Sequence, residues 1–183
     1  MIILASASQR RVELLKDAGI NFKVIPSGIK EEFKSELTPI ENVMEIARLK
    51  ALDVYEKNKG AVVIAADTIV VYKNKVFGKP TSREDAFNML MALNNNTHEV
   101  ITGVAIIDAK GEDVFYSKAS VTFKNLTEEE INNYIDTEEP FGKAGSYAIQ
   151  GLGKELVETY KGDFFTIVGL PLKEVLEKIA IYN

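Results

Sequence analysis

Two consecutive arginines, Arg10 and Arg11, follow Ser8, which favours the N-cap position of a short helix. The N-terminus of a helix carries about half a positive charge, so a cation in its first turn costs about 0.3–1 kcal/mol. A bound anion reverses this argument, because the helix N–H groups and two guanidinium groups would converge on one phosphate. The commoner alternative is that both arginines reach solvent or pair with Glu13 and Asp17.

A single carboxylate, Asp67, interrupts an otherwise apolar run between Ala65 and Val71. A buried carboxylate must be paired, bound to a metal or protonated. An aspartate that caps a loop is the structural alternative, but the apolar run continues past it. The position therefore suits a metal ligand or a general base.

Two lysines stand where stability alone would not place them. Lys50 falls on the apolar stripe of a predicted helix, so it either extends outward along the surface or points into a polar pocket. Lys79 precedes a proline, which holds it extended, although a charged loop tip would look the same.

Gln150 lies in "AIQGLG", between an apolar run and two glycines. Glycines allow the backbone to approach a ligand closely, and a glutamine can hydrogen-bond the edge of a base; the alternative is an ordinary turn. Two arginines, two lysines, one strand carboxylate and this glutamine could together fit a nucleoside triphosphate and a metal ion.

The elements that must position these residues form a mixed pattern. We expect strands at residues 2–5, 21–26, 61–72, 98–108 and 113–124, a short return strand after 73–75, and a hairpin that joins 156–160 to 164–168. We expect helices that start near residues 8, 38, 82, 127 and 170 and end near 19, 57, 93, 139 and 180. Capping boxes support the helices that begin at Thr38 and Thr127. Because strands and helices do not strictly alternate, the sequence predicts an α/β fold with a mixed sheet.

The bulk composition excludes several classes of protein. The chain has 183 residues, which suits one domain or two small lobes, and a net charge of −5, which argues against a nucleic-acid binder. It has no cysteine and one histidine, so thiolate zinc sites, cysteine nucleophiles and histidine metal clusters are excluded. The apolar run at residues 2–5 is too short for a signal peptide, and we expect a cytoplasmic protein without a membrane span.

These residues belong to longer stretches that resemble the Maf family of nucleoside-triphosphate pyrophosphatases, once described as septum-formation inhibitors. The stretches are "LASASQRRVELL", "ARLKA", "AADTIVV", "GKP", "EPFGKAGSYAIQGLG" and "GDFFTIVGLPL", in family order over nearly the whole chain. The resemblance implies a single domain over residues 1–183, with an elongated mixed sheet, flanking helices and a cleft between two lobes. This fold is related to that of inosine-triphosphate pyrophosphatases.

The resemblance also implies an activity and a set of roles. It predicts hydrolysis of dTTP or UTP, or of modified pyrimidine nucleotides, to the monophosphate and pyrophosphate with Mg²⁺ or Mn²⁺. Asp67 matches the proton acceptor, and the phosphate-handling positions are Ser6, Arg10, Arg11, Lys50 and Lys79. Arg10, Thr68 and Gln150 match positions tied to base selectivity, and "ADT" with "IQG" resembles the dTTP/UTP branch. A homodimer is expected from the resemblance alone.

The chain departs from the family pattern at two places. Gln9 stands where proline is usual, and Lys30 stands where an acidic residue is common, so Glu31 is the predicted metal ligand beside Asp67. Two other functions remain open at this point. A nucleotide-binding regulator of cell division would use the same residues without turnover, and a nucleic-acid binder would have to overcome the negative charge.

Overall fold

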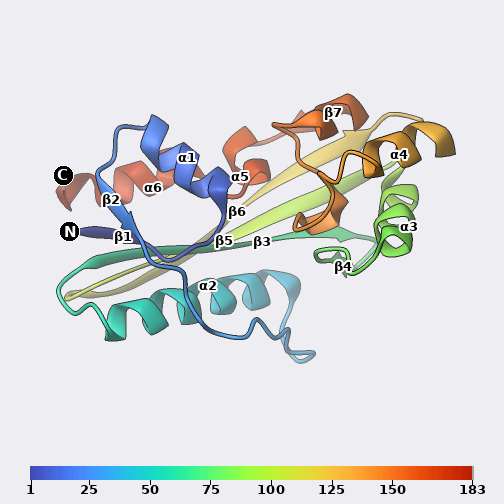
Figure 1. Cartoon of the computed structure of the whole chain (residues 1–183). Helices are drawn as coiled ribbons and strands as arrows, with labels where there is room; N and C mark the ends of the chain where they lie inside the picture. Colours follow the sequence, from blue (N-terminus) through green and yellow to red (C-terminus); the bar gives the residue numbers. More distant parts are fainter. Residues whose placement is uncertain (183) are drawn as a thin grey trace. The chain divides into compact units, whose positions relative to one another are not determined.

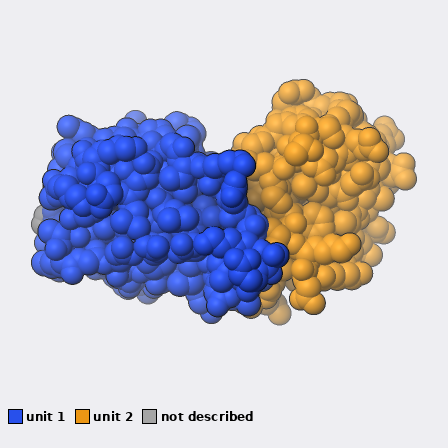
Figure 2. All heavy atoms as spheres, turned by 90° about the horizontal axis from the view of Figure 1, so that it is seen from below, with its two compact units in different colours: residues 1–68, 102–117, 169–183 blue, residues 69–101, 118–168 orange. Residues whose placement is uncertain are grey.

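The computed structural model describes residues 1–182, and the chain divides into two compact units. Unit 1 contains residues 1–68, 102–117 and 169–183, and unit 2 contains residues 69–101 and 118–168 (Figure 2). The long strands β3 (Val62–Tyr72), β5 (Thr97–Asp108) and β6 (Gly111–Phe123) contribute residues to both units.

A seven-stranded mixed sheet has the order β2-β1-β3-β5-β6-β7, with β4 beside β3. The remaining strands are β1 (Ile2–Leu4), β2 (Phe22–Val24), β4 (Lys75–Phe77) and β7 (Val157–Lys161). β1 runs parallel to β2 and β3, whereas β4 is antiparallel to β3 and β7 is antiparallel to β6. The predicted mixed α/β sheet is therefore confirmed. The cleft and the single two-lobed domain stay predictions.

The apolar side chains of β1 and β3 alternate between the two faces of the sheet in unit 1. α1 (Gln9–Asp17) and α6 (Leu172–Ile179) cover one face, and α2 (Pro39–Glu56) covers the other (Figure 1). The first face buries Ile2, Leu4, Val62 and Ile64 with Leu15, Val175 and Ile179, and the second buries Ile3, Val63 and Ala65 with Ala47, Ala51 and Val54. Consecutive residues of β3 therefore point toward different helices.

Two local features fix α2 on its face of the sheet. Its predicted capping box is present: the Thr38 hydroxyl accepts the Glu41 N–H, and the Glu41 carboxylate accepts the Thr38 N–H. Gly103 of β5 passes under the helix, where a Cβ atom would lie only 2.6 Å from the Val43 carbonyl oxygen. The helix consequently sits closer to the strand than any side chain at position 103 would allow.

Unit 2 contains two helices that pack together, α3 (Arg83–Leu93) and α4 (Glu128–Ile135), and α3 also contacts the 3₁₀ turn η1 (Ala144–Ser146). The unit also contains the 3₁₀ turn η2 (Leu152–Leu156) and the helix α5 (Phe164–Val168). The predicted starts of α3 at Ser82 and α4 at Thr127 are confirmed. No helix within residues 1–182 is long and apolar enough to cross a membrane.

The predicted hairpin between residues 156–160 and 164–168 is wrong in its second half. Residues 164–168 form α5, and β7 pairs with β6 instead. The Asp163 carboxylate accepts both the N–H and the hydroxyl of Thr166, at 2.7 and 2.8 Å. Asp163 therefore caps a helix, although Gly162 and Asp163 together had the composition of a hairpin turn.

His98 lies in the core of unit 2, where it is 1% exposed. Its ring packs edge-on against Phe123 and Tyr147, and its Nε2 atom shares a 2.7 Å hydrogen bond with the Tyr147 hydroxyl. Its Nδ1 atom has no hydrogen-bond partner among residues 1–182. Burial lowers the pKa of His98 to about 4, so the ring is neutral at physiological pH.

We predict that His98 makes the protein less stable in acid. Because the pKa of His98 is lower in the folded chain than in the unfolded chain, its contribution is complete above about pH 6.5 and falls by about 3 kcal/mol as the pH approaches 4. His98 is the one histidine of the chain, so its proton resonance can be titrated directly by NMR. A pKa of 6 or above would contradict the prediction, and His98→Gln should show a shallower acid slope of unfolding free energy.

Candidate active site

Lys50 of α2 bridges two carboxylates in unit 1. Its Nζ atom lies 2.8 Å from Glu31 Oε1 and 2.9 Å from Asp67 Oδ1. The side chains of Lys50 and Asp67 are both 11% exposed, whereas that of Glu31 is 41% exposed. Of the alternatives that the sequence left open, Lys50 therefore points into a polar pocket and Asp67 is paired.

Arg11 is buried, and its guanidinium group donates to three segments of unit 1. Nε donates to the Gly169 carbonyl at 2.7 Å, Nη2 to the Thr68 hydroxyl at 3.0 Å, and Nη1 to the Ser6 hydroxyl at 3.3 Å. Burial lowers its pKa to about 10, against the opposing effect of Asp67. The group therefore stays charged at neutral pH, and it already has partners within the protein.

Side chains of β3 alternate between the two faces of the sheet. This alternation explains how neighbouring residues join two clusters, the Lys50 cluster (Glu31, Lys50 and Asp67) and the Arg11 cluster (Ser6, Arg11, Thr68 and Gly169). Asp67 follows the side chains that face α2, so it meets Lys50, whereas Thr68 follows those that face α1, so it meets Arg11. The Thr68 hydroxyl also shares a 2.9 Å hydrogen bond with Thr102. Two consecutive residues thus place polar groups on both faces of one strand.

Charge effects connect the two clusters. Burial has the largest effect on the pKa of Arg11, and nearby charges have smaller ones. Asp67 and Glu31 raise this pKa, whereas Arg10 lowers it. Arg10 itself is half-buried. The structure thus places Ser6, Arg10, Arg11, Glu31, Lys50, Asp67 and Thr68 in unit 1, where hydrogen bonds, ion pairs or charge effects connect them.

The first turn of α1 lacks the side-chain cap that the sequence predicted at Ser8. Ser8 occupies the N-cap position, but its side chain makes no capping hydrogen bond. Its N–H donates instead to the Ser6 hydroxyl at 3.1 Å, while the Gln9 side chain donates to Glu13 one turn later. Ser6 therefore holds both the start of the helix and the Arg11 guanidinium.

Sequence reasoning missed Thr102 and Gly169, which complete the Arg11 cluster. Thr102 stands inside the apolar run of β5, the same signal that identified Asp67 in β3. Gly169 has φ of +125°, and a Cβ atom there would lie 3.4 Å from the Thr68 hydroxyl oxygen and 3.6 Å from Arg11 Nε. A glycine in this conformation lets its carbonyl meet the guanidinium.

The two other predicted residues, Lys79 and Gln150, belong to unit 2. Lys79 is exposed between β4 and α3, and Gln150 is exposed in a turn. The Gly145 N–H donates to the Gly78 carbonyl at 3.1 Å, which ties the Lys79 loop to the segment before Gln150. Within residues 1–182 the side chains of Lys79 and Gln150 make no hydrogen bond, so both remain available for a ligand.

The carboxylate pair could hold a divalent cation. Glu31 and Asp67 both contact one ammonium group, so their oxygens already converge on a point occupied by positive charge. Residues 1–182 contain no group of three or more His, Cys, Asp or Glu side chains that could hold a metal ion. This donor set nevertheless fits Mg²⁺, which commonly takes one or two carboxylates together with substrate phosphates and water.

Comparison with known proteins gives a family for this arrangement. Residues 1–181 match the model of the family described as Maf-like protein. The chain belongs to the Maf family. A relative from Caldicellulosiruptor bescii, named dTTP/UTP pyrophosphatase, is 48% identical over 93% of this chain and 89% of its own length. A relative of the same name from Bacillus anthracis is 44% identical over the whole chain and 95% of its own length.

Solved structures show a more distant similarity to this Maf chain. The Staphylococcus aureus Ham1 protein aligns with a TM-score of 0.46 and 17% identity, over 68% of this chain and 72% of its own.

We predict that Arg11→Lys lowers the free energy of unfolding by about 1–3 kcal/mol, because an ammonium group cannot reproduce the fork that serves three acceptors. Arg10→Lys in the same turn keeps the charge at a half-buried position and should cost less than about 0.5 kcal/mol. Urea denaturation of both variants measures the difference. Equal losses would show that the hydrogen bonds of Arg11 contribute little.

Proposed function

We propose that this Maf protein hydrolyses dTTP and UTP to the monophosphate and pyrophosphate. The observation that carries the proposal is the Lys50 ammonium held between Glu31 and Asp67, because it places a largely buried carboxylate beside positive charge. The full-length relatives named dTTP/UTP pyrophosphatase support the same activity. The resemblance of "ADT" and "IQG" to the pyrimidine-directed branch agrees with this choice of substrate.

In the proposed reaction a water molecule attacks the α-phosphorus of the triphosphate. The Asp67 carboxylate accepts a hydrogen bond from this water and takes its proton as the new P–O bond forms. The bond from the α-phosphorus to the α,β-bridging oxygen breaks, and its electron pair leaves with pyrophosphate. The oxygen of the water becomes part of the monophosphate, and the proton held by Asp67 passes to pyrophosphate or to solvent, which restores the carboxylate.

The cationic side chains neutralise the charge that builds up during this step. Arg10 lies at the open N-terminus of α1, where backbone N–H groups and the helix dipole also favour an anion. Lys50 and Lys79 add charge for the triphosphate and the leaving group. Ser6 and Arg11 bind each other, so they support this turn in addition to their proposed contact with phosphate.

Selectivity for the base is assigned to Arg10, Thr68 and Gln150. The exposed amide of Gln150 offers both a donor and an acceptor to the edge of a pyrimidine. A groove of about 350 Å³ begins beside Gln150, at Ile149, and continues along β7 to the paired rings of Tyr160 and Phe164. Thr68, already bound to Arg11 and Thr102, holds its hydroxyl in one orientation.

Glu31 and Asp67 are the residues that would hold the divalent cation, Mg²⁺ or Mn²⁺. When bound, the cation would neutralise phosphate charge and polarise the bond to be broken. Lys50 would then share these two carboxylates with the cation, which makes it the residue that keeps them together before the metal arrives. A cytoplasmic location and a homodimer belong to the same proposal; the location rests on the sequence pattern, and the homodimer rests on the resemblance alone.

We predict that the protein releases pyrophosphate from dTTP and UTP in a panel of nucleotides tested with Mg²⁺ and Mn²⁺. Asp67→Asn should lower kcat by about 10²- to 10⁴-fold, because the amide cannot take a proton from water. A coupled pyrophosphate assay measures both results. Full activity of Asp67→Asn would remove the role assigned to this residue.

A matched control is Asp113→Asn, which removes a carboxylate from the same unit. Asp113 is exposed and pairs with Lys178 at 2.8 Å, and within residues 1–182 it makes no hydrogen bond or ion pair with Lys50 or Arg11. This variant should keep wild-type kcat and KM. A comparable loss in both variants would indicate a general effect of charge and would count against general-base chemistry at Asp67.

A further inference from the structure

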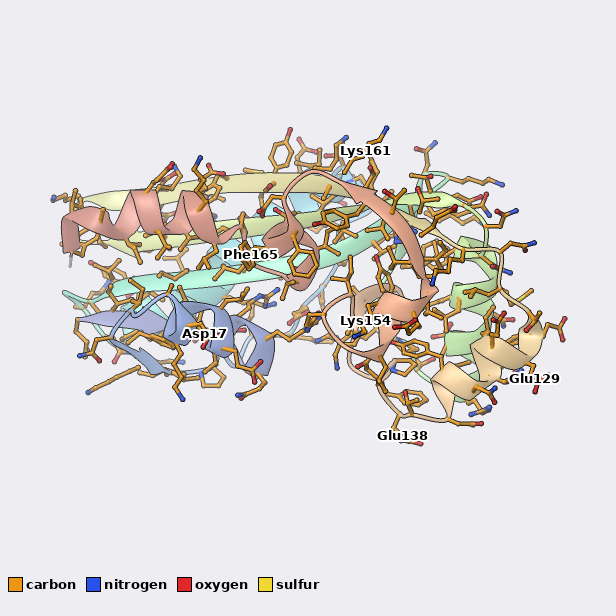
Figure 3. The ribbon with its side chains drawn as sticks, turned by 90° about the horizontal axis from the view of Figure 1, so that it is seen from above. Asp17, Glu129, Glu138, Lys154, Lys161 and Phe165 are labelled. Carbon is orange, nitrogen blue, oxygen red and sulfur yellow. The ribbon has the colours of Figure 1, made fainter. Side chains whose placement is uncertain are left out.

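The turn that carries Gln150 is held from behind by a single carboxylate, Glu139. Its Oε1 atom accepts the Leu152 N–H at 2.9 Å, and its Oε2 atom accepts the Gly153 N–H at 2.8 Å. These two N–H groups belong to the residues two and three positions after Gln150. Figure 3 labels Glu138, the residue before Glu139, and Lys154, the residue after Gly153.

Tyr134 links Glu139 to the backbone that precedes Gln150. The Tyr134 hydroxyl of α4 donates to Glu139 Oε2 at 2.7 Å and accepts the Ala148 N–H at 3.2 Å. Burial and the bond to Glu139 raise the pKa of Tyr134 well above its usual value, so the hydroxyl keeps its proton. Glu139 and Tyr134 thus grip the backbone on both sides of Gln150; we call these two residues the clamp.

Gly151 and Gly153 lie so close to the clamp that neither position has room for a side chain. A Cβ atom at Gly151 would overlap Glu139 Oε1, and one at Gly153 would lie 2.9 Å from the Tyr134 hydroxyl oxygen and 2.6 Å from the Ala148 carbonyl oxygen. The sequence suggested that these glycines let the backbone approach a ligand. In the structure they let the backbone approach Glu139 and Tyr134.

Clamp and turn together leave Gln150 as the exposed polar side chain of the segment 148–153. Leu152 and Gly153 are fixed by Glu139, and Ala148 is fixed by Tyr134, while Ile149 is buried. Gln150 is exposed in the middle of this fixed backbone. An exposed glutamine on a mobile turn would lose side-chain and backbone entropy on binding, whereas one on a clamped turn loses less.

We propose that Glu139, supported by Tyr134, is a positioning residue that aims Gln150 at the nucleobase and so sets the preference for uracil over cytosine. The inference rests on the proposed function, in which Gln150 contacts the base. Uracil presents an N3–H donor beside the O4 acceptor, and cytosine reverses this order, so the orientation of the glutamine amide decides between them. Glu139 touches neither base nor phosphate in this proposal, and it acts through the backbone.

The test compares the ratio of kcat/KM for UTP to that for CTP in wild type, Glu139→Gln and Tyr134→Phe. Glu139→Gln sets an amide N–H₂ group against a backbone N–H and should lower the ratio about tenfold, mainly through a higher KM for UTP. Tyr134→Phe keeps the ring and removes the hydrogen bonds to the Ala148 N–H and to the Glu139 carboxylate, so it should lower the ratio by a smaller factor. Glu138→Gln, an exposed neighbour with the same loss of charge, should leave the ratio unchanged.

A second comparison shows whether Glu139 acts through Gln150. In a Gln150→Ala background, adding Glu139→Gln should not lower the ratio further. An undiminished effect in that background would overturn the inference, as would equal losses for UTP and CTP in Glu139→Gln. Faster amide exchange at Leu152 and Gly153 in Glu139→Gln is expected, and unchanged exchange would also overturn it.

These readouts separate the inference from the proposed function. If the wild type binds UTP without releasing pyrophosphate, the proposed function fails, and the ratio of the dissociation constant for CTP to that for UTP replaces the kinetic ratio. A lower ratio in Glu139→Gln would then still support the clamp, and an unchanged ratio would overturn it.

Discussion

The buried guanidinium of Arg11 is the constraint on which the candidate site depends. A charge removed from water must be matched by hydrogen-bond partners, and these partners come from segments that are far apart in the chain. Ser6 follows β1, Thr68 lies in β3 and Gly169 precedes α6. Each segment must reach Arg11 for the fold to tolerate the charge, so the same requirement that stabilises the core also assembles the polar residues beside Asp67.

The second constraint is the two-residue period of β3. Because neighbouring strand residues face opposite sides, Asp67 and Thr68 can serve two clusters without competing for the same space. The arrangement also demands that α2 lie close to the sheet, since Lys50 must reach Asp67 from that helix. Gly103 permits this approach by offering no Cβ atom opposite the Val43 carbonyl. The close contact between Gly103 and Val43 thereby helps to place the Lys50 ammonium beside Asp67.

The sequence predicted what depends on local pattern and missed what depends on long-range contact. Asp67 and Lys50 were recognisable because each interrupts an apolar stripe, and the structure pairs them. The bond from Arg11 to Gly169 was not recognisable, because nothing in the neighbouring residues indicates a contact across most of the chain. The same limit applies to α5, where one capping carboxylate outweighed a turn-like composition. The family motif included Glu139, yet its contacts with Leu152 and Gly153 appear only in the folded chain.

The two units hold their polar side chains by different physical means. In unit 1, Asp67 and Thr68 stand on a strand, and the packing of helices on both faces fixes their directions. In unit 2, Gln150 stands on a turn that the Gly151 N–H closes by donating to the Ala148 carbonyl, and a side chain holds the next two N–H groups. A strand tolerates many apolar neighbours and needs little further support, whereas a turn requires a specific acceptor and glycines that allow it to come close. For this reason the sequence around Gln150 is rich in glycine, while the sequence around Asp67 is rich in alanine, valine and isoleucine.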